Sequence, residues 1–205
     1  MKVYVATSNV GKLREMAEMF AGSDMQLATF AEYQSPVEGD TSYAENAALK
    51  ARALYAQLQR SGRRANVLAD DSGLEVYALD HRPGVLSAFY GGTHATWPDR
   101  RKKLLAELAA AGSDDRRARF VSAMHFIDDA GREFASMGTV DGEIAPAERG
   151  DGGFSFDPIF LYPPAAKTFA ELDEAEKNRV SHRAIAVAAL MAAVRASAVG
   201  FTPGR

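Results

Sequence analysis

The stretch LADDSGLEV, residues 68–76, places two acids, a serine and a glycine inside an otherwise apolar run. The residues from Asn66 to Ala69 have the character of a short buried strand, which we expect to end at the acids. Adjacent carboxylates at the end of a core strand are costly unless a cation or a hydrogen-bonding group neutralises them. The stretch therefore predicts a functional site at this strand end, with Asp71 as its first candidate.

Toward the N-terminus, the sequence predicts a strand, a polar loop and a helix in succession. Residues 3–6 read as a buried strand, and Thr7, Ser8 and Asn9 offer side chains that cap a helix. Apolar residues then recur at helical spacing until Gly22 ends the helix.

Toward the C-terminus, the pattern predicts four more helices and an antiparallel portion of the sheet. Ser42 and Glu45 fit a capping box at the start of a long helix, and residues 128–131 read as a hairpin turn. We expect helices at about 42–59, 99–111, 169–178 and 181–198, strands at 119–127, 132–144 and 159–162, and a frayed tail at 201–205. This order predicts an α/β fold with a mixed sheet flanked by helices.

Composition restricts the function classes. The chain has 205 residues, a net charge of −3 and no cysteine, which excludes disulfides and thiolate metal sites. With this net charge the protein as a whole is not expected to attract nucleic acid or an anionic membrane, so any polyanion must be met by local positive charge. The short apolar start predicts no secretory signal, and no apolar run reaches 18 residues, so we expect a cytoplasmic protein.

Two polar clusters point to phosphate and a hard cation. TSNVGK, residues 7–12, opens a helix, where free N–H groups and the helix dipole favour an anion, while Lys12 opposes the dipole. This is either a capped helix with a solvated lysine or a phosphate site, and no P-loop pattern decides between them. Glu38 and Asp71 are carboxylates without histidine or cysteine partners, which suits Mg²⁺, and Ser72-Gly73 beside Asp71 favours a site over a plain turn.

Two further clusters point to an aromatic ligand. In GDGGFSFDP, residues 150–158, Phe154 and Phe156 are either hydrophobic pins that hold the loop or a stacking surface for a base, which Asp157 would orient. Lys177, His182 and Arg183 lie near the start of a helix, where positive charge is unfavourable unless a ligand is bound. Jointly, the four clusters describe a site for a nucleoside triphosphate with Mg²⁺.

The sequence resembles the Ham1-like nucleoside triphosphate pyrophosphatases, which act on inosine and xanthosine triphosphates. The resemblance extends along nearly the whole chain, and it implies that residues 1–205 form a single domain. Its motifs, in order, are ATSNVGKLREM (6–16), EGDTSYAENAALKA (38–51), ADDSGLEV (69–76), PGVLSAFYGG (83–92), GGFSFDPIF (152–160) and ELDEAEKNRVSHRA (171–184). The resemblance implies an elongated mixed sheet with helices around it, two lobes with the active-site cleft between them, and a homodimer.

The family also implies an activity and roles for residues. The activity is hydrolysis of non-canonical purine (deoxy)nucleoside triphosphates, such as ITP, dITP and XTP, to the monophosphate and pyrophosphate, with Mg²⁺ or Mn²⁺ in its place. By position, Glu38 and Asp71 would bind the metal, and Asp71 would also be the general base. The substrate would be bound by Thr7, Ser8, Asn9, Lys12 and Ser72 at the phosphates and by Phe154, Ser155, Phe156, Asp157, Lys177, His182 and Arg183 at the base.

The chain departs from the family pattern at two loops. It has GFSFD where the family has GFGYD, with Ser155 for glycine and Phe156 for a more polar aromatic residue, and it has SAFY with Phe89 where arginine is usual. Two alternatives are a Maf-like pyrophosphatase for other modified nucleotides and a nucleotide-binding sensor with weak turnover. The first should lack the SHR motif and the glycine-rich loop, both of which are present. The second is opposed by Lys12, Glu38 and Asp71, while Phe89 leaves it open.

Overall fold

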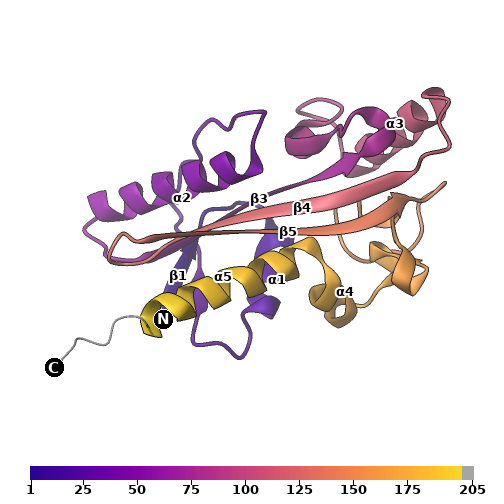
Figure 1. Ribbon diagram of the computed structural model, residues 1–205. Coiled ribbons are helices and arrows are strands. Elements are labelled where there is room, and N and C mark those ends of the chain that lie inside the picture. The colour runs from indigo at the N-terminus through magenta and orange to yellow at the C-terminus, as the bar shows by residue number, and fades with distance from the viewer. Residues whose placement is uncertain (200–205) are drawn as a thin grey trace. The chain divides into compact units, whose positions relative to one another are not determined.

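A seven-stranded sheet runs through the protein, with helices packed along it (Figure 1). The computed structural model describes residues 1–199. The strand order is β2-β1-β3-β4-β5-β6-β7, in which β1 is parallel to β2 and β3, whereas β6 is antiparallel to β5 and β7. The predicted mixed α/β sheet is therefore confirmed.

The strands and α-helices have the following bounds. The strands are β1 (Lys2–Val5), β2 (Gln26–Ala28), β3 (Asn66–Val76), β4 (Arg117–Ile127), β5 (Glu133–Ile144), β6 (Phe160–Tyr162) and β7 (Lys167–Thr168). The helices are α1 (Val10–Met19), α2 (Tyr43–Arg60), α3 (Trp97–Ala110), α4 (Glu174–Val180) and α5 (His182–Val199). Short 3-10 turns are η1 (Tyr77–Leu79), η2 (Gly84–Phe89), η3 (Asp157–Ile159), η4 (Pro163–Ala165) and η5 (Phe169–Glu171).

The chain divides into two compact units. Among the described residues, the first contains 1–71, 122–138 and 183–199, and the second contains 72–121 and 139–182. The three long strands β3, β4 and β5 contribute residues to both units. The second unit is built around an apolar cluster from α3, the strands and the loop before η3, which includes Leu104, Phe120, Phe156 and Phe160. The cleft expected between two lobes stays a prediction.

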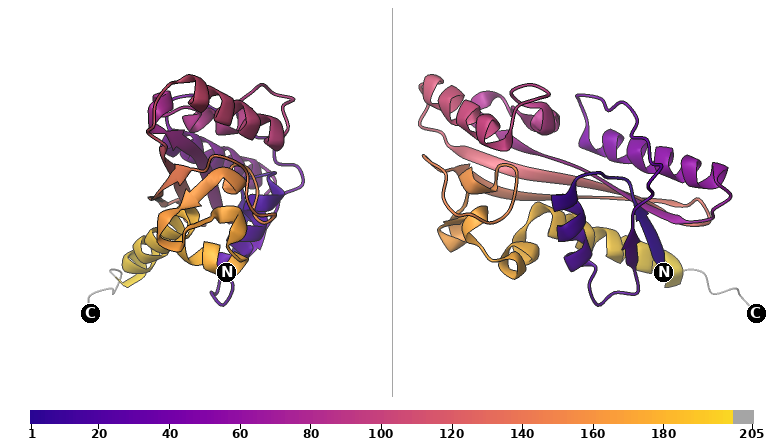
Figure 2. Two further views of the ribbon diagram at one scale, coloured as in Figure 1. Left: turned by 90° about the vertical axis from the view of Figure 1, so that its right-hand side faces the viewer. Right: turned by 180° about the vertical axis from the view of Figure 1, so that it is seen from behind.

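The first unit has helices on both faces of its strands (Figures 1 and 2). One face packs on α2 and contains Val67 and Ala69 of β3, whereas the other packs on α1 and α5 and contains Leu68. Successive residues of a strand point to opposite faces, so this alternation continues to the next two residues. Asp70 consequently lies on the α1 and α5 face, and Asp71 lies on the α2 face.

Local signals for helix ends and turns are largely confirmed. Asn9 is the N-cap of α1, and Ser42 is the N-cap of α2, whose hydroxyl accepts a hydrogen bond from the N–H of Glu45. The predicted hairpin turn joins β4 to β5, with the N–H of Gly131 donating to the carbonyl of Asp128. Most other boundaries shift by one or two residues. The tail at 201–205 lies outside the described residues.

Two predictions about secondary structure are wrong. The strand expected to end at Ala69 continues as β3 through both acids to Val76, so Asp71 lies within a strand and not in a loop after it. The acids do not end the strand because each meets cations on its own face. The helix expected at 169–178 is instead η5 followed by α4, because capping boxes at Thr168 and Asp173 start two separate elements.

None of the described helices is long and apolar enough to cross a membrane alone, although α4 and residues 182–197 have the combined length and composition for it as a bent pair.

Candidate functional site

The loop before α1 is shaped by its own side chains. The hydroxyl of Thr7 accepts a hydrogen bond of 3.1 Å from the N–H of Asn9, and the side chain of Asn9 accepts one of 3.2 Å from the N–H of Lys12. Ser8 between them is exposed. These bonds fix the path of the chain into α1, and Ser8 lies exposed at this helix start, where the helix dipole favours an anion.

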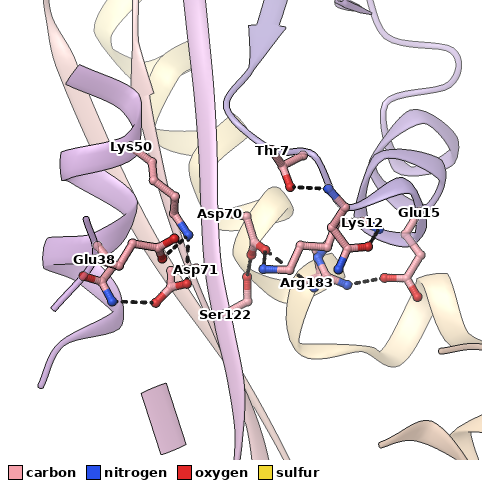
Figure 3. Close-up of polar contacts among 11 residues, drawn as sticks. Thr7, Lys12, Glu15, Glu38, Lys50, Asp70, Asp71, Ser122 and Arg183 are labelled. Atoms are coloured by element: carbon pink, nitrogen blue, oxygen red, sulfur yellow. Dashed lines mark hydrogen bonds and ion pairs between the residues drawn. The ribbon is translucent and has the colours of Figure 1, made fainter. Parts of the chain in front are cut away.

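On the α2 face of β3, two carboxylates converge on one ammonium (Figure 3). The Nζ of Lys50 lies 2.8 Å from the Oε2 of Glu38 and 2.9 Å from the Oδ1 of Asp71. Asn46, one turn earlier on α2, donates to the other oxygen of Asp71 at 3.3 Å. The loop that contains Glu38 is tied to α2 by Asn46, which bonds to both the N–H and the carbonyl of Gly39.

Burial and charge act against each other in this group. Burial raises the pKa of Asp71 in spite of the positive charges of Lys50 and Lys12. For Lys50, burial favours the neutral amine, but attraction by Asp71 and hydrogen bonds to Glu38 and Asp71 raise its pKa overall. Lys50 therefore stays charged, and Asp71 is a stronger proton acceptor than a solvent-exposed aspartate.

The same group has the chemistry to bind a divalent cation. Oxygens of Glu38 and Asp71 already meet at a single positive charge, the ammonium of Lys50. Hard cations such as Mg²⁺ take carboxylate oxygens together with water and phosphate oxygens. Within residues 1–199, no three His, Cys, Asp or Glu side chains form a metal-binding group. The residues therefore fit a cation that completes its coordination with water and substrate.

On the α1 and α5 face, Asp70 is surrounded by donors (Figure 3). Its carboxylate lies 2.6 Å from the Nζ of Lys12 and 3.6 Å from the Nη2 of Arg183, and accepts a 2.5 Å hydrogen bond from the hydroxyl of Ser122. Arg183 also forms an ion pair with Glu15 of α1. Burial opposes ionisation, but the charges of Lys12 and Arg183 hold the pKa of Asp70 well below its usual range.

In the second unit, the glycine-rich loop is held by Asp157. The Oδ2 of Asp157 accepts hydrogen bonds from the N–H of Phe154 at 2.7 Å and from the Nζ of Lys177 at 2.5 Å. The same Nζ lies 4.9 Å from the centre of the Phe154 ring. Gly153 has a φ of 68°, and a Cβ there would collide with the Asp157 carboxylate. The loop therefore presents Phe154, which is partly exposed, beside a buried lysine.

The two loop phenylalanines have different surroundings. Phe156 is 0% exposed and packs edge-on against Trp97 at 5.5 Å and Tyr90 at 6.4 Å between ring centres. The hypothesis of a hydrophobic pin therefore describes Phe156 in this structure, and Phe154 is left as the candidate for stacking. His182 is buried and stacks on Phe120 at 4.7 Å, as part of the second unit.

The departures from the family pattern have local consequences. Ser155 adopts a φ of 61°, which glycine tolerates better than serine, and its carbonyl accepts a 2.8 Å hydrogen bond from Arg101. Arg101 is also paired with Glu148 at 2.9 Å, so α3 braces the loop in spite of the serine. Phe89, in place of arginine, is 55% exposed at the end of η2.

Comparisons with known proteins identify the family of this chain. A model of the Ham1 family matches residues 3–193. The chain is 44% identical to a dITP/XTP pyrophosphatase of Thermus thermophilus over 197 residues, which covers 95% of this chain and 92% of the relative. This chain belongs to the Ham1 family. Among solved structures, the Ham1 protein of Staphylococcus aureus matches with a TM-score of 0.82 at 33% identity and covers 96% of this chain and 100% of its own. The HAM1 protein of Coxiella burnetii matches with a TM-score of 0.81 at 36% identity and covers 95% of this chain and 98% of its own.

Membership in the Ham1 family removes the reason for a Maf-like alternative. The contacts of the site also bring in residues that the sequence did not single out, namely Glu15, Asn46, Lys50, Asp70 and Ser122. A signal for two of them was present, because Asn46 and Lys50 fall on the apolar stripe of α2 beside Ala47, Ala51 and Leu54. A polar or charged residue on a buried helix face requires a partner.

Proposed function

We propose that this chain hydrolyses non-canonical purine (deoxy)nucleoside triphosphates, such as ITP, dITP and XTP, to the monophosphate and pyrophosphate. The observation that carries the proposal is the convergence of Glu38 and Asp71 on one positive charge in a chain of the Ham1 family. The names of its relatives, dITP/XTP pyrophosphatases of Thermus thermophilus and Geobacillus kaustophilus, support the same activity.

The phosphate chain is assigned to the loop before α1 and its surroundings. Thr7, Ser8 and Asn9 offer polar groups at the open start of the helix, and Lys12 adds a positive charge. Ser72 follows Asp71 on β3 and is proposed to contact the phosphates as well. Helix starts bind phosphate because their N–H groups lack partners within the helix.

Mg²⁺ or Mn²⁺ is proposed to bind at Glu38 and Asp71, where it would neutralise phosphate charge. The chain's own chemistry in the reaction is proton transfer by Asp71. A water molecule attacks the α-phosphorus, its proton passes to the Asp71 carboxylate, and the bond from the α-phosphorus to the bridging oxygen breaks to release pyrophosphate. Burial raises the pKa of Asp71, which makes its carboxylate a better base for this water.

The purine is assigned to the glycine-rich loop and to the start of α5. Phe154 has a partly exposed ring for stacking, and Lys177 lies beside it as a donor. Asp157 fixes the loop, while Ser155 and Phe156 shape it. His182 and Arg183 are proposed to read the purine edge, because an N–H donor suits the 6-oxo group of inosine and xanthine and not the 6-amino group of adenine.

A turnover panel tests this function. Release of pyrophosphate is measured from ITP, XTP, dITP, GTP and ATP with Mg²⁺, and we expect ITP and XTP to exceed ATP by roughly tenfold to several hundredfold. Exhaustive EDTA treatment should abolish turnover, and Mg²⁺ or Mn²⁺ should restore it. Binding of ITP without turnover would instead identify a nucleotide sensor. Light scattering tests the homodimer, and fractionation of cells tests the proposed cytoplasmic location.

A further inference from the structure

The buried carboxylate of Asp70 is not explained by substrate binding. Its side chain is 0% exposed and its oxygens are occupied by Lys12, Ser122 and Arg183, so it does not offer a surface to a ligand or to water. Apart from Ser122, the strand residues nearby that are buried on this face include apolar ones, with Leu68 before Asp70 on β3 and Met124 on β4. A buried ion pair at such a place stabilises a fold no better than well-packed apolar residues.

Lys12, in contrast, needs a partner. It lies in the first turn of α1, where the helix dipole disfavours a cation. Burial, together with the nearby charges of Arg183 and Lys50, lowers the pKa of Lys12, and the attraction of Asp70 opposes this. The Lys12 side chain keeps 14% of its surface exposed, whereas Asp70 keeps none. The lysine is thus the member of the pair that reaches solvent.

We propose that Asp70 is a positioning residue that holds the ammonium of Lys12 at the open start of α1 for a phosphate. Ser122 orients Asp70 in turn, since its hydroxyl donates to the Oδ1 of Asp70 while Lys12 contacts Oδ2. The chain Ser122–Asp70–Lys12 connects β4, β3 and α1 within the first unit. The proposal rests on the proposed function, because it requires Lys12 to be a phosphate ligand.

The test measures binding of inorganic tripolyphosphate by calorimetry, since this probe has no base. We expect Lys12→Met and Asp70→Asn each to weaken binding roughly ten- to hundredfold, and Ser122→Ala to weaken it by less. Because Asp70 acts through Lys12, Asp70→Asn should have almost no further effect in the Lys12→Met background. Asp128→Asn is the matched control: Asp128 is also buried and ion-paired, with Arg132 at 2.6 Å, but lies at the hairpin turn.

Several outcomes overturn the proposal. Additive losses in the double variant would show that Asp70 supports the fold and does not act through Lys12. Tighter binding by Asp70→Asn would show that Asp70 competes with phosphate for Lys12. Unchanged binding by Asp70→Asn would also contradict the proposal. If Asp70→Asn does not fold, unchanged binding by Ser122→Ala would contradict it in the same way. Failure of the proposed function is distinguishable, because it leaves tripolyphosphate binding intact while ITP is not hydrolysed.

Discussion

Replacing Lys50 by methionine keeps the length of the side chain and removes the charge that Glu38 and Asp71 share. The ammonium lies 2.8 Å and 2.9 Å from these carboxylates and makes a hydrogen bond to each. In the variant, two negative charges would face each other across an apolar side chain. A divalent cation would then be the natural replacement for the lost charge.

The size of the effect follows from burial. Removing one partner of a buried ion pair costs about 3–5 kcal/mol. The cost here is smaller for two reasons. The Glu38 side chain is 29% exposed and can be hydrated when Lys50 is absent. Burial also raises the pKa of Asp71, so that this carboxyl takes up a proton more readily. We expect the free energy of unfolding without metal to fall by about 2–3 kcal/mol. For a chain of this size, that lowers Tm by roughly 4–12 °C.

The assay is thermal unfolding of both proteins in EDTA and in increasing MgCl₂. A ligand present at 100 times its Kd stabilises the native state by about 2.7 kcal/mol. In the parental protein, Mg²⁺ must first displace Lys50 from both carboxylates. The variant should therefore bind Mg²⁺ more tightly and gain more stability from it. We therefore expect the difference in Tm to be large in EDTA and to narrow as Mg²⁺ is added.

Two results would refute this reasoning. If Lys50→Met is as stable as the parent in EDTA, the ammonium does not compensate the carboxylates. If both proteins gain the same Tm from Mg²⁺, the cation does not bind where Lys50 lies. Lys167→Met is the control for loss of a lysine, because Lys167 is exposed and its ion pair with Glu176 is long, at 4.0 Å. It should change neither Tm nor the response to Mg²⁺.

Three further predictions concern catalysis, base selection and pH. Asp71→Asn should abolish pyrophosphate release from ITP while leaving the circular dichroism spectrum unchanged, and turnover near the parental rate would show that Asp71 is not the base. Arg183→Ala should lower kcat/KM for ITP more than for ATP. Equal losses for the two substrates would show that Arg183 only forms its ion pairs with carboxylates and does not read the base. Hydrogen bonds from Lys103 and Tyr90 lower the pKa of Glu107 from 4.5 to about 2. Its ionised form thus stabilises the fold above pH 4.5, and this contribution is lost as the pH falls toward 2. Glu107→Gln should be less stable at neutral pH, and its free energy of unfolding should change less between pH 4.5 and about 2. Urea unfolding at several pH values measures both effects.

Much of the fold could be predicted from the sequence, because its signals are local. The N-caps at Asn9 and Ser42 and the turn at residues 128–131 depend on hydrogen bonds between residues two to four apart. The order of strands and helices follows from periodicity over similar distances. The order of elements predicted the mixed sheet, and the ordered family motifs, which run from residue 6 to residue 184, added the family.

The arrangement of the charges could not be predicted in this way. Asp70 and Asp71 read as one acidic pair, but the extension of β3 through them turns their side chains to opposite faces. Lys50 reaches Asp71 across 21 positions, and Ser122 reaches Asp70 across 52. Phe156 reads as a stacking residue or a pin, and only the packing of Trp97 and Tyr90 around it favours the pin. Such contacts join residues that are distant in the chain, so tertiary packing alone decides which charge neutralises which and which ring remains exposed.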